Sequence, residues 1–154
     1  MKTPDTAGVV APPPLIYLAA LVVGLVLRAV APTPFLPRDL SVGVGVLLVV
    51  IAVGLSVWGV RTMRHAGTPV SPRAPTTALV TAGPFRFSRN PLYVSLTLCY
   101  LGIAIATQAL WAIPLLVVVL VVMRRGVIDR EERYLERKFG AEYLRYKARV
   151  RRWM

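Results

Sequence analysis

The sequence predicts an all-α integral membrane protein with about four transmembrane helices, which include a C-terminal helical hairpin and are followed by a charged cytoplasmic helical tail. Hydrophobic residues make up 56% of the 154 residues, and the mean hydropathy of +0.61 is far above that of an ordinary soluble domain. The hydrophobic residues gather in long apolar runs, whereas most of the 19 Lys and Arg side chains lie between or after these runs. Composition and charge pattern therefore both indicate a membrane protein.

The first two apolar runs, Leu15 to Ala31 and Leu40 to Val60, are about as long as a helix that crosses ~30 Å of hydrocarbon. They predict an N-terminal two-helix membrane segment over residues 1–61. Residues 62–80 follow as a cytoplasmic linker, and prolines make its residues 66–77 irregular, so the helices on either side need not be tightly coupled. Small residues four apart predict close-packing faces between helices: Ala20 and Gly24, Ser41 and Gly45, Ala52 and Ser56.

The third part, residues 81–154, contains an apolar stretch from Leu92 to Met123 that is interrupted at Thr107-Gln108 and at Pro114. It predicts a helical hairpin of two runs of roughly sixteen residues, each slightly short for a full crossing. The hairpin either spans locally thinned lipid or dips in and returns, and both geometries leave its two ends on one side of the membrane.

Charge predicts which side this is. Residues 61–90 carry five arginines and no acidic residue, and the tail from Arg124 onward carries 11 of the 19 Lys and Arg residues. The positive-inside rule places both segments in the cytoplasm, and an even number of passes places both termini there too. We therefore expect an integral protein of the cell inner membrane whose functional groups face the cytoplasm.

Polar, basic and aromatic side chains crowd residues 83–94, where the linker leads into the hairpin. Asn90 followed by Pro91 predicts a helix start, because the Asn side chain can accept from a free backbone N–H and Pro fits the first helical turn. The segment thus delivers Arg86 and Arg89 to a helix N-terminus. The arginines, the free N–H groups and the positive end of the helix dipole together favour a bound carboxylate or phosphate.

The charged run from Asp129 to Gly140 keeps a helical pattern, and Gly140 is typical of a helix end. Composition alone favours an amphipathic helix that lies on the membrane surface. Glu131 and Glu132 support a sharper hypothesis, because they follow the last apolar run by less than three turns and at least one can face the basic helix start. Opposed in this way, a carboxylate and an arginine can hold a zwitterion by its amine and its carboxylate.

Several other classes of function fit the sequence less well. His65 is the only histidine and Cys99 the only cysteine, so we expect no metal site and no intrachain disulfide. The net charge of +12 lies largely on two segments attached to membrane helices, so membrane lipids rather than nucleic acid are the expected partners. Transport is disfavoured because the apolar runs hold almost no ionisable residue besides Arg28, whereas a small non-enzymatic membrane protein stays open.

A resemblance adds to this interpretation. The chain resembles the isoprenylcysteine carboxyl methyltransferase family and its phospholipid methyltransferase relatives in two motifs: Gly83 to Tyr93 and, after an apolar hairpin, Glu131-Glu132 with later aromatic residues. The likeness covers roughly residues 81–152. The two motifs are a specific signal of this family because they occur in this order and at this separation. The residues that follow the two glutamates in the second motif are Leu135, Phe139-Gly140, Tyr143 and Tyr146.

The resemblance implies an integral membrane enzyme that binds S-adenosylmethionine, releases S-adenosylhomocysteine and methylates a lipophilic small molecule or a lipid. Residues 81–154 would be the catalytic part, with Glu132, Glu131 and Arg89 as the expected catalytic residues. The expected cofactor-binding residues are Arg86, Arg89, Asn90, Pro91, Leu92, Tyr93, Glu132, Tyr143 and Tyr146. Asn90 stands where the family commonly has His, so a proton-handling role of that His does not transfer to this chain. The acceptor stays open between the carboxylate of a prenylated cysteine, a phospholipid amine and a thiol, and so does the oligomeric state.

Overall fold

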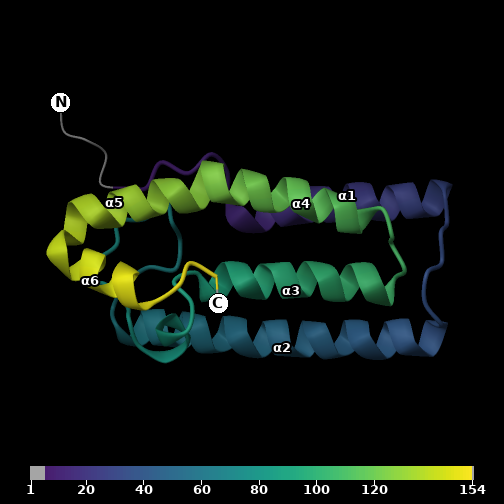
Figure 1. Cartoon of the computed structure of the whole chain (residues 1–154), viewed down its shortest axis with the longest axis horizontal. Helices are drawn as coiled ribbons and strands as arrows, with labels where there is room; N and C mark the ends of the chain where they lie inside the picture. Colours follow the sequence, from purple (N-terminus) through teal and green to yellow (C-terminus); the bar gives the residue numbers. More distant parts are fainter. Residues whose placement is uncertain (1–5, 154) are drawn as a thin grey trace.

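The structure is a computed structural model that describes residues 6–153, so the expected start of the first segment at residues 1–5 lies outside the described residues. The described part consists of helices and irregular connections and contains no strand. Four helices lie side by side in a bundle and two shorter ones gather at one of its ends (Figure 1). The helices are α1 (Pro13–Val30), α2 (Arg38–His65), α3 (Pro91–Ala106), α4 (Ala112–Met123), α5 (Asp129–Phe139) and α6 (Ala141–Arg149).

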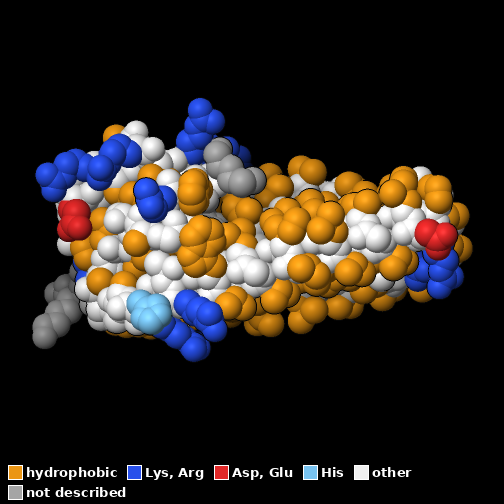
Figure 2. Space-filling model, turned by 90° about the horizontal axis from the view of Figure 1, so that it is seen from below, with side chains coloured by type: hydrophobic (Ala, Val, Ile, Leu, Met, Phe, Trp, Pro, Cys, Tyr) orange, Lys and Arg blue, Asp and Glu red, His pale blue; other side chains and the backbone are white. Residues whose placement is uncertain are grey.

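Helices α1 and α2 are both long and apolar enough to cross a membrane, and α3 is a shorter apolar helix of 16 residues. Both long helices were expected, although α2 continues to His65, beyond the predicted end at Val60. Most large hydrophobic side chains on α1 and α2 are exposed. Figure 2 shows that hydrophobic side chains cover the long part of the molecule on this face, while Lys and Arg gather toward the left end. This surface fits a protein whose helices contact lipid.

Small residues bring the helices close together. A Cβ atom on Gly45 of α2 would lie 2.5 Å from the carbonyl oxygen of Gly102 in α3, and one on Gly24 of α1 would lie 2.6 Å from the Cβ of Ala112 in α4. Ser41, four residues before Gly45, is fully buried. The predicted close-packing faces are therefore confirmed at these positions. The extensive α2–α3 contact also shows that the irregular linker does not leave its flanking helices loosely coupled, because direct backbone packing joins them.

The hairpin turns where the sequence predicted, at Thr107-Gln108. Gln108 has a positive φ of 54°, and its side-chain oxygen accepts a hydrogen bond from the Phe35 N–H at 3.2 Å. The Trp111 Nε1 donates to the Ala31 carbonyl at 3.1 Å. Both bonds tie the hairpin turn to the α1–α2 connection, at the end of the bundle opposite α5 and α6 (Figure 1).

The chain stays helical from Ala112 to Phe139, so α4 runs on into α5 (Figure 1). Residues Arg124–Ile128 form a π-helical turn, η2, between the two α-helices. Its Gly126 carbonyl accepts a hydrogen bond at 3.2 Å from the Val10 N–H of the N-terminal segment. The α5 helix then ends at Gly140, whose φ is 51°, as the sequence predicted.

Candidate functional site

A cavity of about 550 Å³ lies at the end of the bundle that α5 and α6 cover. Its walls come from five parts of the chain: the end of α2, the linker, the start of α3, and the facing sides of α5 and α6. Pro12, Pro13 and Pro14 at the start of α1 complete it. The cavity volume is within the roughly 300–1,000 Å³ that small-molecule sites usually have.

The loop before α3 is held by its own side chains and by the C-terminal tail. The Ser88 hydroxyl accepts from the Asn90 N–H at 3.1 Å, and Pro91 occupies the first turn of α3 as predicted. Asn90 stands at the N-cap position of α3, but the prediction that its side chain accepts a hydrogen bond from a backbone N–H of this helix is wrong. Its amide donates instead to the Arg152 carbonyl at 2.9 Å, because the C-terminal tail passes beside this loop and presents that oxygen. The Arg89 N–H likewise donates to the Arg151 carbonyl at 2.9 Å.

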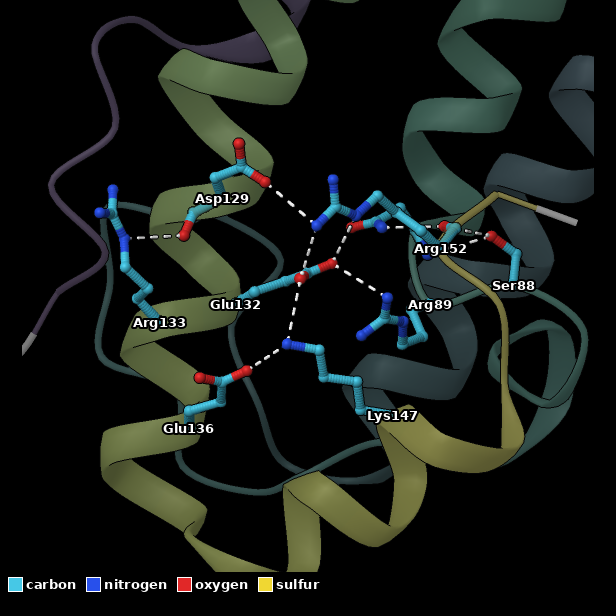
Figure 3. Close-up of polar contacts among 9 residues, drawn as sticks. Ser88, Arg89, Asp129, Glu132, Arg133, Glu136, Lys147 and Arg152 are labelled. Carbon is cyan, nitrogen blue, oxygen red and sulfur yellow. Dashed lines mark hydrogen bonds and ion pairs between the residues drawn. The ribbon is translucent and has the colours of Figure 1, made fainter.

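Glu132 of α5 lies at the centre of a cluster of cations from three other segments (Figure 3). Arg152 of the tail donates to both carboxylate oxygens, at 2.8 and 2.9 Å. Arg89 Nη2 lies 3.3 Å from Oε1, and Lys147 Nζ of α6 lies 3.7 Å from Oε2. Glu132 is only 5% exposed. One buried carboxylate therefore faces three cations, and two of these cations are shared with a second carboxylate, Arg152 with Asp129 at 3.1 Å and Lys147 with Glu136.

Arg89 has donors that the protein does not use. Its side chain is 9% exposed, and Nη2 faces Glu132, whereas Nε and Nη1 have no hydrogen-bond partner within residues 6–153. A buried polar group without a partner is costly, and the N–H groups of a guanidinium form strong hydrogen bonds to carboxylates and phosphates. Because Arg89 also lines the cavity, this geometry suits an anionic group of a ligand.

Glu131, the neighbour of Glu132, has a different environment. The Tyr93 hydroxyl of α3 lies 2.8 Å from each of its carboxylate oxygens, and Glu131 forms no ion pair among the described residues. Burial raises the pKa of Glu131 to about 7, with a smaller raising effect from the Glu132 charge, and the Tyr93 hydrogen bond lowers that pKa in part. Consecutive helix residues point about 100° apart, so the two carboxylates face different walls of the cavity.

Tyr143 and Tyr146 of α6 are 2% and 5% exposed, and their ring centroids lie 6.2 Å apart. The Tyr146 hydroxyl donates to the Phe85 carbonyl at 2.7 Å, which joins α6 to the loop before α3. Burial, with a smaller contribution from the Glu132 charge, raises the pKa of Tyr143 to about 12, although Arg89 opposes both effects. Both phenols therefore stay neutral near pH 7 and form an uncharged wall of the cavity.

The structure brings nearly all of the sequence-predicted site residues to this cavity. Those that line it are Arg89, Asn90, Pro91, Leu92, Tyr93, Glu131, Glu132, Tyr143 and Tyr146. Arg86 is the exception, since it is exposed and does not line the cavity.

Sequence reasoning missed Arg152 and Lys147, the two further cations on Glu132. Neither stands in a motif, and only the surplus of basic residues in the tail indicated them. The linker also forms part of the cavity wall. The Thr76 N–H donates to the Tyr134 hydroxyl at 3.1 Å, and the Thr77 N–H to the Thr68 hydroxyl at 3.1 Å, so the linker is held against α5.

Comparison with known proteins gives a family match. Residues 40–142 match the phospholipid methyltransferase family. An uncharacterized protein of Haemophilus influenzae is 53% identical over 38 residues, which are 25% of this chain and 60% of that protein. The cobalt-zinc-cadmium resistance protein CzcN of Cupriavidus metallidurans is 39% identical over 69 residues, which are 44% of this chain and 32% of that protein. The matches thus span less than two thirds of either relative, and no solved structure matches the chain.

Proposed function

Because this chain belongs to the phospholipid methyltransferase family, whose members are membrane methyltransferases, we propose that it transfers the methyl group of S-adenosylmethionine to a lipophilic acceptor. The observation that carries the proposal is Arg89, a buried guanidinium at the cavity wall with two unused donor nitrogens. The methionine end of this cofactor is a zwitterion, and its carboxylate fits these donors. The cavity volume of about 550 Å³ is also sufficient for a small-molecule ligand.

Glu132 has two roles in this proposal. It orients Arg89 through the ion pair with Nη2, which leaves Nε and Nη1 without a partner in the protein. A carboxylate has about four lone-pair sites, and Arg152 donates to two of them, so Glu132 can also accept from the cofactor amine. Asn90, Pro91 and Leu92 form the adjoining wall at the start of α3.

The cofactor supplies an electrophilic methyl group with a sulfide leaving group, so the protein mainly has to align the reactants and exclude water. Tyr143 and Tyr146 close the cavity toward α6 with neutral, buried rings. Val60 and Leu96 add apolar surface from α2 and α3, the helices that we expect to meet lipid. We propose that a lipophilic acceptor reaches the cavity from the membrane, whereas the cofactor comes from the cytoplasm.

The same proposal covers the topology. Residues 1–61 form the two-helix membrane segment, residues 62–80 the cytoplasmic linker that walls the cavity, and residues 81–154 the catalytic hairpin and tail. The hairpin contributes the third and fourth passes. Both termini and the cavity then lie on the cytoplasmic side of the inner membrane, in agreement with the basic residues of the linker and tail.

Calorimetric titration of the detergent-purified protein with S-adenosylmethionine and S-adenosylhomocysteine tests the proposal. We expect saturable binding of both. Absence of binding both in detergent and in lipid would refute the cofactor assignment and leave a non-enzymatic membrane role. For the acceptor path, methyl transfer only to water-soluble acceptors, and to none in the lipid phase, would contradict a route from the membrane.

A further inference from the structure

The two adjacent carboxylates of α5 differ in their charge environment. Glu132 is compensated by Arg89, Arg152 and Lys147. Glu131 has the neutral Tyr93 hydroxyl as its partner at 2.8 Å and no cation in ion-pair contact among residues 6–153. An uncompensated carboxylate inside a cavity is unfavourable for stability, so a function is the simplest reason for its presence.

Glu131 also faces a different side of the cavity from the cation cluster. Its partner Tyr93 packs against the hydrophobic core between α1, α3 and α4, next to Leu96, which is itself in the cavity wall. The cation cluster around Glu132 lies toward α6 and the tail. If the polar end of the cofactor lies at Arg89, Glu131 is on the apolar side, where a lipophilic acceptor would lie.

We propose that Glu131, held by Tyr93, takes up the proton that the methyl acceptor loses. The methyl acceptor is therefore a lipophilic amine or thiol rather than a carboxylate. This inference rests on the proposed function. In the reaction the nucleophile X–H gives its proton to the Glu131 carboxylate, a new X–CH₃ bond forms, and the sulfur–methyl bond breaks with its electron pair left on the sulfide. A carboxylate acceptor has no proton to lose and would be repelled by Glu131.

The groups around Glu131 fit this role. Tyr93 faces it from α3, and Tyr17 of α1 lies beyond, bonded at 2.8 Å to Thr97. On its own helix the nearest charge is Glu132, which raises the pKa of Glu131, while Arg130 turns away to the Gly8 carbonyl at 2.7 Å. Burial and this acidic neighbour bring the pKa of Glu131 to about 7, and a proton acceptor works best when its pKa is near the working pH.

The test compares the wild type with Glu131→Gln and Tyr93→Phe, with Glu142→Gln as a control because Glu142 is exposed on α6 and does not line the cavity. Transfer of a labelled methyl group is measured to three lipophilic probes: dodecanethiol, N-methyldodecylamine and palmitate. S-adenosylhomocysteine affinity is measured by calorimetry, and infrared spectra between pH 5.5 and 8.5 follow the protonated carboxyl band.

We expect the wild type to methylate the thiol or the amine, and the stronger of the two to identify the acceptor class. Glu131→Gln should keep S-adenosylhomocysteine affinity within about threefold while transfer falls by roughly 100-fold, as for loss of a general base. It should also lose an infrared carboxyl band that titrates near pH 7. In Tyr93→Phe the carboxylate loses its hydrogen bond, so its pKa and the rate profile should move to higher pH.

Three results would overturn this inference while the proposed function stands: methylation of palmitate alone or of none of the probes, unchanged transfer in Glu131→Gln, or a parallel loss of S-adenosylhomocysteine binding in that variant. The last result would make Glu131 a cofactor ligand instead. Failure of the wild type to bind S-adenosylhomocysteine would refute the proposed function itself and, with it, this inference.

Discussion

Replacing Arg89 with alanine should abolish most of the cofactor affinity and leave the fold intact. The two unused nitrogens, Nε and Nη1, lie on different edges of the guanidinium, so a single cofactor carboxylate would accept from one of them. A hydrogen bond to a charged group contributes about 1.5–3 kcal/mol. At about 1.4 kcal/mol per tenfold change, Arg89→Ala should weaken S-adenosylhomocysteine binding by roughly 10- to 100-fold. Glu132 keeps Arg152 and Lys147 as partners, so no buried carboxylate is left uncompensated.

The chain supplies a matched control for this experiment. Arg86 lies on the same loop with the same charge, but it is exposed and outside the cavity wall, so Arg86→Ala should bind like the wild type. Arg89→Lys keeps the charge and loses the planar guanidinium with its fixed donor directions, so its affinity should lie between those of the wild type and Arg89→Ala. The reasoning fails if Arg89→Ala binds within about threefold of the wild type, or if Arg86→Ala weakens binding equally.

Three more predictions concern the cavity and the packing. Glu132→Ala leaves Arg89, Arg152 and Lys147 without their shared carboxylate. The variant should still fold in detergent, and calorimetry should show that it binds S-adenosylhomocysteine at least tenfold more weakly. Unchanged affinity would show that Glu132 is not part of the site. Gly45→Val should lower the unfolding temperature of the protein in detergent, because its Cβ would lie 2.5 Å from the Gly102 carbonyl oxygen and overpacking costs about 1–3 kcal/mol. As a control, the Cβ of Gly54→Ala enters open space, so this variant should leave the unfolding temperature nearly unchanged. As pH rises from 4.5 to about 7, the unfolded chain loses the Glu131 proton while the folded chain retains it. The free energy of unfolding should therefore fall by up to about 3 kcal/mol over this range. Denaturant titrations of Glu131→Gln should not show this fall.

Local signals in the sequence were sufficient for most of the helices. The Asn90-Pro91 start of α3, the turn at Gln108 and the stop at Gly140 each depend on residues within a few positions of one another. The pairs of small residues likewise predicted where helices approach, because a missing side chain permits close contact whatever the partner is. Which helix approaches which was not predictable, since the spacing of glycines carries no information about the partner.

The candidate site was predictable in part for the same reason. Arg89 and Glu132 were paired in the hypothesis because they belong to two motifs at opposite ends of one hairpin, whose geometry brings its ends together. Arg152 completes the cluster only because the tail folds back past α6 onto the loop before α3, and no periodicity encodes that path. The Asn90 side chain was misassigned for this reason: its observed acceptor is a carbonyl 62 residues away in sequence.

The π-helical turn at Arg124–Ile128 sets the register between α4 and the two carboxylates of α5. Removing or adding a single residue before Asp129 would rotate everything after it by about 100°, which is the angle that separates Glu131 from Glu132. A deletion would turn Glu132 to the wall that Glu131 now faces, and an insertion would turn Glu131 to the wall of Glu132, without altering either residue. During divergence, this stretch should therefore accept substitutions on its exposed side far more readily than insertions or deletions. A comparison of chain lengths across this turn in many relatives would reveal that constraint.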